Sequence, residues 1–362
     1  MSLQRLSHWR RASITINPDA LAHNLSRVRQ YAPRSQVMAV IKADAYGHGM
    51  LLAAEQLQNA DSFAVAMPEE AYVLRAAGCD KPIIVLHGFS NQAELEKFSA
   101  LNISAVIHQQ AQLDCLQSCT LNSPIDAWLK VDTGMHRLGV SLADAEVSFG
   151  LLRNSKNISN IYMMSHFANA EDANNSLNSK QLESFIKVAN DSEVDCSMAN
   201  SAAIMRLSQS HFAVVRPGIM LYGCSPFVDS SATDLGLKAA MQFESALIEI
   251  KQIKAGESIG YGGTYTCERD TTIGIVAAGY ADGYPRHAKN GTPVWLNGER
   301  CSLLGRVSMD SICIDLTDVT ASIDDRVVLW GAELSVDEVA MSSDSISYEL
   351  LCNAGAACFN QP

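Results

Sequence analysis

The residue with the clearest chemical potential in this chain is Lys42, which ends the apolar run VMAVIK. An apolar strand that carries a lysine into a cleft lowers the pKa of its amine by desolvation and exposes a neutral nucleophile. Such an amine is suited to forming a Schiff base with a carbonyl compound. The alternative is a structural lysine whose ammonium group reaches solvent along its aliphatic stem.

A second chemical feature is independent of the lysine. The segments ANSAA and RPGIMLYG have the composition of an anion cradle. Ser201 offers a hydroxyl, and the backbone N–H groups near Gly218 and Ile219 can approach an anion closely because glycine has no Cβ. A lysine combined with a phosphate cradle indicates pyridoxal phosphate, with Arg216 available for the pyridine nitrogen. The alternative for Ser201 and Gly218 is an ordinary helix N-cap and turn.

The elements that must position these residues are short apolar runs, each followed by a turn and a stretch with helical periodicity. The runs cover residues 36–42, 62–67, 82–88, 103–108, 125–132, 161–167, 194–201 and 212–218. Near-continuous apolar runs are typical of parallel strands that are buried on both faces. Eight strand–helix units in about 200 residues favour an α/β fold with an N-terminal (β/α)8 TIM-type barrel. An open doubly wound sheet is the alternative.

Catalytic side chains of such barrels usually lie at the C-terminal ends of the strands. Polar residues occupy these ends here: Lys42, His87, His108, Lys130 with Asp132, His166, Asn200 with Ser201, and Arg216. The lysine and both parts of the cradle are therefore predicted to share one face of the barrel.

The pattern changes after about residue 235, where alternating apolar and polar residues and the turn signals AG, NG and DG predict antiparallel strands. We expect a barrel domain over 1–235 and a mostly antiparallel β domain over 236–362, with one late helix near 345–352. Residues before about 18 are candidates for pairing with the β domain. The linker is expected within 225–236.

Composition excludes several classes of function. The chain has 27 Lys and Arg against 39 Asp and Glu, a net charge of -12, which argues against a broad basic surface for nucleic acid. Ten acids and a single base lie from Asp310 onward. No apolar run reaches the length of about 18 that a membrane span needs, and the N-terminus has no apolar core of a secretory signal. Ten scattered cysteines without a CxxC pair indicate reduced core thiols rather than a metal site. We therefore expect a cytoplasmic protein.

Eight motifs, in order along nearly the whole chain, carry a family resemblance. They are AVIKADAYGHG, LKVDTGMHRLG, SHFANAE, MANSAA, VRPGIMLYG, SIGYGGTY, AAGYADGYPR and GRVSMD. Together they resemble bacterial alanine racemase. The resemblance implies a pyridoxal 5'-phosphate enzyme that interconverts L-alanine and D-alanine by a two-base mechanism and supplies D-alanine for peptidoglycan. It also implies a homodimer with active sites at the subunit interface.

The same resemblance assigns roles to the predicted catalytic residues. Lys42 matches the lysine that holds the cofactor and serves as the base for the D-enantiomer. Tyr261 matches the opposing base, contributed by the partner subunit, although on its own it would be interpreted as an aromatic residue of a sheet. Arg216 matches the arginine that faces the pyridine nitrogen, and His166 matches part of a hydrogen-bonded chain between Tyr261 and Arg216.

Arg137 matches the residue that contacts the cofactor's phenolic oxygen and the substrate carboxylate, and Lys130 matches a lysine carbamylated in many family members. The resemblance places Tyr46, Ser201, Gly218 and Ile219 at the phosphate, with Asn200 beside them. It places Met309 and Asp310 of the partner subunit near the substrate carboxylate, and Tyr280 and Arg286 at the entrance of the site or behind it. Glu171 and Asp172 are either acids at the entrance or solvated charges of a loop.

The C-terminal tail departs from the family pattern. After YELL (348–351), family members usually continue to an Arg-Val-Pro segment, and some place a phosphate-contacting tyrosine there. This chain reads CNAGAACFNQP, which has neither arginine nor tyrosine, so the tail is left outside the predicted site.

Other functions remain open from the residues alone. A barrel-type decarboxylase would keep a carboxylate opposite the pyridine nitrogen, where this chain has Arg216. A broad-specificity racemase is a second alternative, because small pockets exclude large side chains by sterics and the volume of the pocket cannot be derived from one sequence. A non-catalytic pyridoxal phosphate carrier and a class I aldolase would not need the β domain that bears Tyr261.

Overall fold

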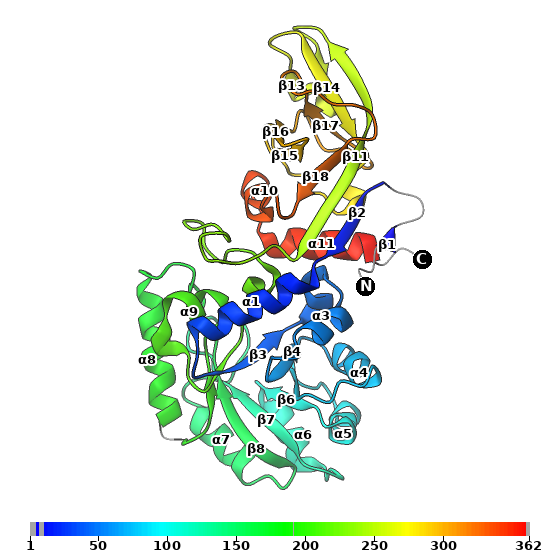
Figure 1. Cartoon of the computed structure of the whole chain (residues 1–362). Helices are drawn as coiled ribbons and strands as arrows, with labels where there is room; N and C mark the ends of the chain where they lie inside the picture. The colour runs from blue at the N-terminus through cyan, green and yellow to red at the C-terminus, as the bar shows by residue number, and fades with distance from the viewer. Residues whose placement is uncertain (1–4, 7–10, 191, 360–362) are drawn as a thin grey trace.

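The computed structural model describes residues 5, 6, 11–190 and 192–359. Residues 1–4 and 7–10 lie outside this range. The prediction that the N-terminus has no secretory signal therefore concerns mostly residues outside the described part of the chain. The chain forms a barrel and a β domain, with helix α11 between them (Figure 1).

Eight parallel strands close into a barrel in the order β10-β3-β4-β5-β6-β7-β8-β9. They are β3 (Gln36–Val40), β4 (Ser62–Val65), β5 (Ile83–Val85), β6 (Ser104–Ile107), β7 (Ile125–Lys130), β8 (Ile158–Met164), β9 (Cys196–Ser197) and β10 (Val214–Val215). Each overlaps one of the apolar runs, because those runs are buried on both faces. The predicted fold class is confirmed, and the open doubly wound alternative is wrong.

Helices follow these strands along the chain, and most of them cover the outside of the barrel, whereas α2 and η2 contribute residues to a cavity at its end (Figure 1). These helices are α1 (Pro18–Tyr31), α2 (Lys42–Gly47), α3 (Met50–Gln56), α4 (Pro68–Ala76), α5 (Gln92–Leu101), α6 (Gln110–Ser118), α7 (Ala145–Arg153), α8 (Ser176–Asn190), α9 (Ser201–Arg206), η1 (Ser208–Ser210) and η2 (Ile219–Tyr222). Local sequence explains their starts. Asn17, for example, caps α1 by accepting from the N–H groups of Asp19 and Ala20, and proline follows it at the first helical position.

The β domain is organised around the long strand β11 (Met241–Ile253), whose first half alternates between buried and half-buried residues. This strand pairs with β2, β18 and β14, all antiparallel, so that β2 joins the β domain although it precedes the barrel (Figure 1). The other elements are β1 (Arg5–Leu6), β2 (Ser13–Ile16), β12 (Ser258–Ile259), η3 (Tyr261–Gly263), β13 (Tyr265–Thr266), β14 (Thr271–Val276), η4 (Tyr280–Asp282), β15 (Pro293–Leu296), β16 (Glu299–Ser302), β17 (Ile312–Asp315) and β18 (Arg326–Trp330).

The late helix predicted near 345–352 is present as α11 (Ser347–Phe359), which runs further than predicted, and a second helix just before it, α10 (Val336–Ser342), was not predicted. Helix α10 is too short to give a clear periodic signal, although Ser335 caps it by accepting from the N–H of Asp337. Helix α11 runs on through NAGAACF, since alanine is a strong helix former and a single glycine does not end a packed helix.

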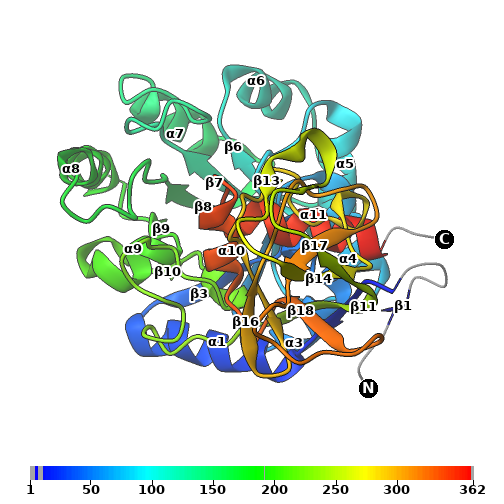
Figure 2. The ribbon, with the colours of Figure 1, turned by 90° about the horizontal axis from the view of Figure 1, so that it is seen from above.

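Helix α11 joins the two parts of the molecule. One cluster of buried apolar side chains continues from the barrel into the β domain. Seen from above, α11 crosses the end of the barrel beneath the β-domain strands (Figure 2). It packs against α2 so closely that Gly355 leaves no room for a Cβ next to Gly47. The helix therefore brings residues of the C-terminal region to the end of the barrel that carries Lys42.

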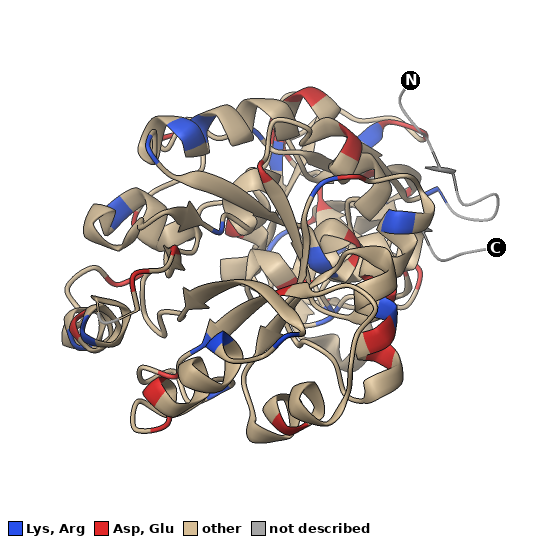
Figure 3. Cartoon of the chain, turned by 90° about the horizontal axis from the view of Figure 1, so that it is seen from below, with Lys and Arg blue, Asp and Glu red and all other residues tan. Residues whose placement is uncertain are grey.

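Positively and negatively charged residues are interspersed along the outer helices and loops in the view from below (Figure 3). Within the described residues, no helix is long and apolar enough to cross a membrane. The same residues contain no group of three or more His, Cys, Asp or Glu side chains that could hold a metal ion.

Candidate active site

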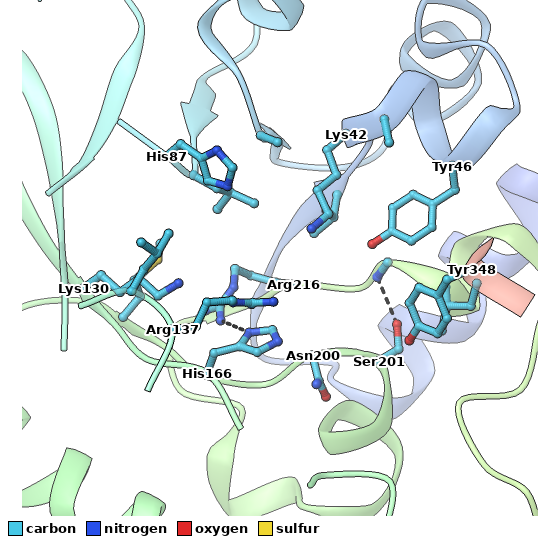
Figure 4. A pocket seen from close by; sticks show the side chains of 18 of the residues that line it. Lys42, Tyr46, His87, Lys130, Arg137, His166, Asn200, Ser201, Arg216 and Tyr348 are labelled. Carbon is cyan, nitrogen blue, oxygen red and sulfur yellow. Dashed lines mark hydrogen bonds between the residues drawn. The ribbon is translucent and has the colours of Figure 1, made fainter. Parts of the chain in front are cut away.

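A cavity of about 430 Å³ opens at the C-terminal ends of the barrel strands (Figure 4). Ten of the residues predicted from the sequence line it: Lys42, Tyr46, Lys130, Arg137, His166, Asn200, Ser201, Arg216, Gly218 and Ile219. They come from segments up to 177 residues apart, which are brought together because the strands of a closed parallel barrel end at one face.

Lys42 enters the cavity through an unusual turn. The four residues that follow it, 43–46, all have left-handed backbone angles, with φ between 51° and 55°. This conformation costs about 1–2 kcal/mol for each residue that carries a Cβ. Glu70 offsets part of the cost, because its Oε1 accepts from the N–H of Ala43 at 2.6 Å while its Oε2 accepts from the N–H of Ala66, directly after β4, at 2.8 Å. The turn places Lys42 and Tyr46 side by side at the cavity (Figure 4).

Four cationic side chains line this cavity, and none of the lining residues is Asp or Glu. Burial and the charge of Arg137 lower the pKa of Lys42. Burial, followed by the charges of Arg216 and Arg137, lowers the pKa of Lys130 to about 8. Because these cations repel one another in a partly desolvated space, an anionic ligand would relieve the repulsion.

Arg216 is 5% exposed, and among the described residues its hydrogen-bond acceptors are all neutral groups. Its guanidinium donates to Ser197 Oγ at 2.7 Å, to the carbonyl of Ser165 at 2.6 Å and to His166 Nδ1 at 3.1 Å. Burial lowers the pKa of Arg216 to about 10, so that it is a cation at neutral pH. Burial and this cation hold the pKa of His166 well below its usual range. His166 is therefore neutral, and the bond to Arg216 assigns its proton to Nε2.

The loop that carries Arg137 is shaped by Asp132. Its Oδ1 accepts from three consecutive backbone N–H groups, those of residues 134–136, at 2.9 to 3.1 Å. Burial alone would raise the pKa of Asp132, but these hydrogen bonds and His136 lower it overall. The N–H of Val140 then donates to the carbonyl of Lys130, which closes the loop over the end of β7. The closed loop places Arg137 among the residues that line the cavity.

The residues predicted to form a phosphate cradle lie together at the cavity. Asn200 caps α9 by accepting from the N–H of Ala203, and the Oγ of Ser201 accepts from the N–H of Gly218 at 2.9 Å. A Cβ on Gly218 would stand 2.6 Å from the hydroxyl of Tyr46, so a larger residue there would require the tyrosine to move. Two hydroxyl groups and backbone donors thus surround a space that a side chain would otherwise fill. This donor set, together with the lysine and arginines, fits pyridoxal phosphate.

Comparison with known proteins identifies the family. The description "Alanine racemase, N-terminal domain" matches residues 16–226, and "Alanine racemase, C-terminal domain" matches residues 240–360. The chain belongs to the alanine racemase family. The resemblance drawn from the sequence motifs is confirmed, and with it the assignment to the racemases, which are isomerases.

Relatives and solved structures cover nearly the whole chain. The alanine racemase of Vibrio parahaemolyticus is 45% identical over 94% of this chain and 96% of its own length. The biosynthetic alanine racemase of Escherichia coli is 44% identical, again over 94% of this chain and 96% of its own. The crystal structure of biosynthetic alanine racemase from Pseudomonas aeruginosa has a TM-score of 0.93 at 42% identity, and the match covers 95% of this chain and 97% of that one.

Sequence reasoning missed two residues from α11 that line the cavity of this alanine racemase family member, Tyr348 and Cys352. The decision to leave the C-terminal tail outside the site is therefore corrected. The two residues are four apart, which places them on one face of the helix. The ring of Tyr348 lies 5.8 Å from that of Tyr46, centre to centre (Figure 4). His87, which was noted only as a strand-end residue, also lines the cavity.

Five predicted site residues do not line this cavity: Tyr261, Met309, Asp310, Tyr280 and Arg286. Tyr261 and Met309 are 69% and 52% exposed, and the neighbouring strand β13 lies at the end of the β domain far from the barrel (Figure 1). Tyr280 and Arg286 line a separate hollow between η4 and α11. Among the described residues of a single chain, the cavity thus brings together Lys42 and the predicted cradle residues, whereas Tyr261 lies elsewhere.

Proposed function

We propose that this chain interconverts L-alanine and D-alanine with pyridoxal 5'-phosphate as its cofactor, in a site that a second copy of the chain completes. The observation that carries the proposal is the cavity in which Lys42 lies beside an anion cradle and three further cations. Membership of the alanine racemase family supports the same reaction.

The residues that would hold the cofactor differ in what they contribute. Lys42 would bind its carbonyl carbon covalently, since a partly desolvated amine is neutral more often than an exposed one. Tyr46, Ser201 and the backbone N–H groups of Gly218 and Ile219 would hold its phosphate, with Asn200 shaping the turn beside them. When bound, pyridoxal phosphate draws electrons away from the α-carbon of an amino acid and so acidifies the α-hydrogen.

Arg216 would face the pyridine nitrogen of the cofactor. Because arginine stays protonated and only donates hydrogen bonds, it leaves that nitrogen unprotonated. His166 accepts from Arg216 at Nδ1 and keeps its Nε2 proton for a further partner. Arg137 would bind the substrate carboxylate, helped by Met309 of the partner subunit. Lys130 would orient Arg137 in a carbamylated form, whose negative charge attracts the guanidinium, because the unmodified ammonium group repels it.

Racemisation requires one proton acceptor on each face of the α-carbon. Lys42 Nζ serves one face. We assign the other face to the hydroxyl of Tyr261 of the partner subunit, which His166 would assist with its Nε2 proton. The exposure of Tyr261 and Met309 supports this arrangement, because large side chains of this kind suit contact with a second subunit. The functional unit is therefore proposed to be a homodimer.

The remaining parts of the proposal concern organisation and biology. We retain the domain boundary between residues 235 and 236, which falls in the gap between the two family matches. Tyr280, Arg286 and Asp310 are proposed to lie at or behind the entrance of the partner's site. We propose that the enzyme works in the cytoplasm and supplies D-alanine for peptidoglycan. A relative named as a biosynthetic alanine racemase supports the biosynthetic part of this proposal.

The function is tested on the purified chain incubated with pyridoxal phosphate. We expect a visible absorption band, borohydride reduction that fixes the cofactor to Lys42, and interconversion of L- and D-alanine followed by optical rotation. A chain that binds no cofactor would contradict the whole proposal, whereas a chain that binds it without racemisation would be a carrier. Tyr261→Phe should keep the cofactor and slow racemisation by at least about a hundredfold.

A further inference from the structure

The strand that leads to Lys42 is tied to the cradle segment at one residue, Val40. The N–H of Val40 donates to the carbonyl of Pro217 at 3.0 Å, and its carbonyl accepts from the hydroxyl of Tyr222 at 2.9 Å. Pro217 and Tyr222 flank Gly218 and Ile219 in the sequence. These two hydrogen bonds therefore join the lysine strand to both sides of the cradle.

Tyr222 is also packed against the cradle through its ring. It is 1% exposed and lies between Tyr46 and His48, with ring centres 4.7 Å and 4.6 Å away. Burial raises the pKa of Tyr222 well above its usual value, so its hydroxyl stays protonated and keeps donating. The residue does not line the cavity, and any influence on a ligand has to act through its neighbours.

We propose that Tyr222 is a positioning residue that fixes the spacing between the Lys42 amine and the phosphate cradle. The inference rests on the proposed function, because spacing matters only for a ligand that contacts both. In pyridoxal phosphate the ring and a short CH2–O linkage keep the carbonyl carbon and the phosphate within a narrow range of distances. Binding at one end therefore strengthens binding at the other only if the chain already holds Lys42 and the cradle at that spacing. Without this preorganisation, part of the binding free energy of the cofactor would be lost in bringing the lysine strand and the cradle to the required spacing.

The test is Tyr222→Phe, which keeps the ring and its packing and removes only the hydroxyl. Three probes are titrated into the apoenzyme by fluorescence: pyridoxal phosphate, which contacts both parts; inorganic phosphate, which contacts only the cradle; and pyridoxal, which contacts only Lys42. We expect pyridoxal phosphate to bind about tenfold more weakly than to wild type, the effect of losing one well-placed hydrogen bond. The affinities for phosphate and pyridoxal should stay within about twofold.

The matched control is Tyr284→Phe. Tyr284 is 1% exposed, and its hydroxyl has no hydrogen-bond partner among the described residues. All three affinities should be unchanged in this variant. The inference is overturned if Tyr222→Phe binds pyridoxal phosphate as wild type does, or if all three probes weaken by the same factor, which would indicate local damage. A wild-type chain that fails to bind pyridoxal phosphate would instead contradict the proposed function.

A measurement on the wild-type apoenzyme covers the case in which Tyr222→Phe does not fold. Amide hydrogen exchange is followed in peptides that contain Val40 and in peptides that contain Met220, with and without pyridoxal phosphate. If the chain itself holds the spacing, both peptides are protected before the cofactor is added, and the cofactor changes their protection by less than about tenfold. Protection that arises only with the cofactor would overturn the inference.

Discussion

Gly355 provides a sharp test of how the C-terminal helix supports the site. A Cβ at this position would stand 2.6 Å from the carbonyl carbon of Gly47, and nearer still to its Cα and oxygen. Non-bonded carbon atoms normally stay about 3.5–4.0 Å apart. Gly355→Ala therefore forces α11 away from the turn that carries Lys42 and Tyr46, and both elements line the cavity.

The expected magnitude follows from two opposing contributions to the free energy of unfolding. Alanine is favoured over glycine within a helix by about 1 kcal/mol. A forced backbone contact costs about 1–3 kcal/mol. Gly150→Ala is the matched control, because Gly150 lies in helix α7 with nothing within 4 Å of the new Cβ. The control has only the favourable contribution, so Gly355→Ala should be less stable than Gly150→Ala by the steric cost, about 1–3 kcal/mol.

The assay compares urea unfolding of the two apoenzyme variants by circular dichroism, followed by titration with pyridoxal phosphate. Gly150→Ala should be at least as stable as wild type and bind the cofactor equally well. Gly355→Ala should unfold at lower urea and bind the cofactor more weakly, since α11 also carries Tyr348 and Cys352. The reasoning is refuted if Gly355→Ala matches the control in both measurements.

Three further predictions address the charges around the cavity. With a pKa of about 8 for Lys130 in the folded chain and 10.5 as its ordinary value, the unfolded chain binds more protons between these pH values. The apoenzyme should therefore gain stability as pH rises from 8 to 10.5, by at most about 3 kcal/mol, and Lys130→Met should lose this dependence in urea unfolding. Arg216→Lys cannot keep all the hydrogen bonds of the guanidinium and should lower kcat/KM for alanine by about tenfold to a hundredfold; near-wild-type kinetics would contradict its role. Asp132→Ala frees the loop of Arg137 and should raise the KM for alanine by about tenfold, whereas an unchanged KM would show that Asp132 does not position Arg137.

Much of the fold could be predicted because parallel strands buried on both faces leave apolar runs in the sequence. Even the two-residue strands β9 and β10 fell within predicted runs. Closure of the barrel could not be derived, since periodicity says nothing about which strands pair at the ends. The short helix α10 was missed for lack of a repeating pattern, and α11 extended further than expected because the alanines of the tail continue it.

The residues of the candidate site also differ in whether their position could be predicted from the sequence. Lys42, Arg216 and the Ser201 cradle could be predicted because they follow barrel strands directly, where position in the fold determines position in space. Tyr348 and Cys352 reach the cavity from a distant helix, and only the three-dimensional packing reveals this. The left-handed turn after Lys42 has no local signal either, because three of its four residues are Ala or Tyr, which do not favour that conformation. It is held by partners elsewhere, such as Glu70.

The most direct test of a shared two-base site mixes two inactive variants, Lys42→Ala and Tyr261→Phe. Each homodimer lacks one base in both sites, whereas a mixed dimer has one site with both bases missing and one that is intact. After subunit exchange at equal concentrations, random pairing should restore about a quarter of wild-type racemase activity. Mixed dimers that form but remain inactive would contradict the account.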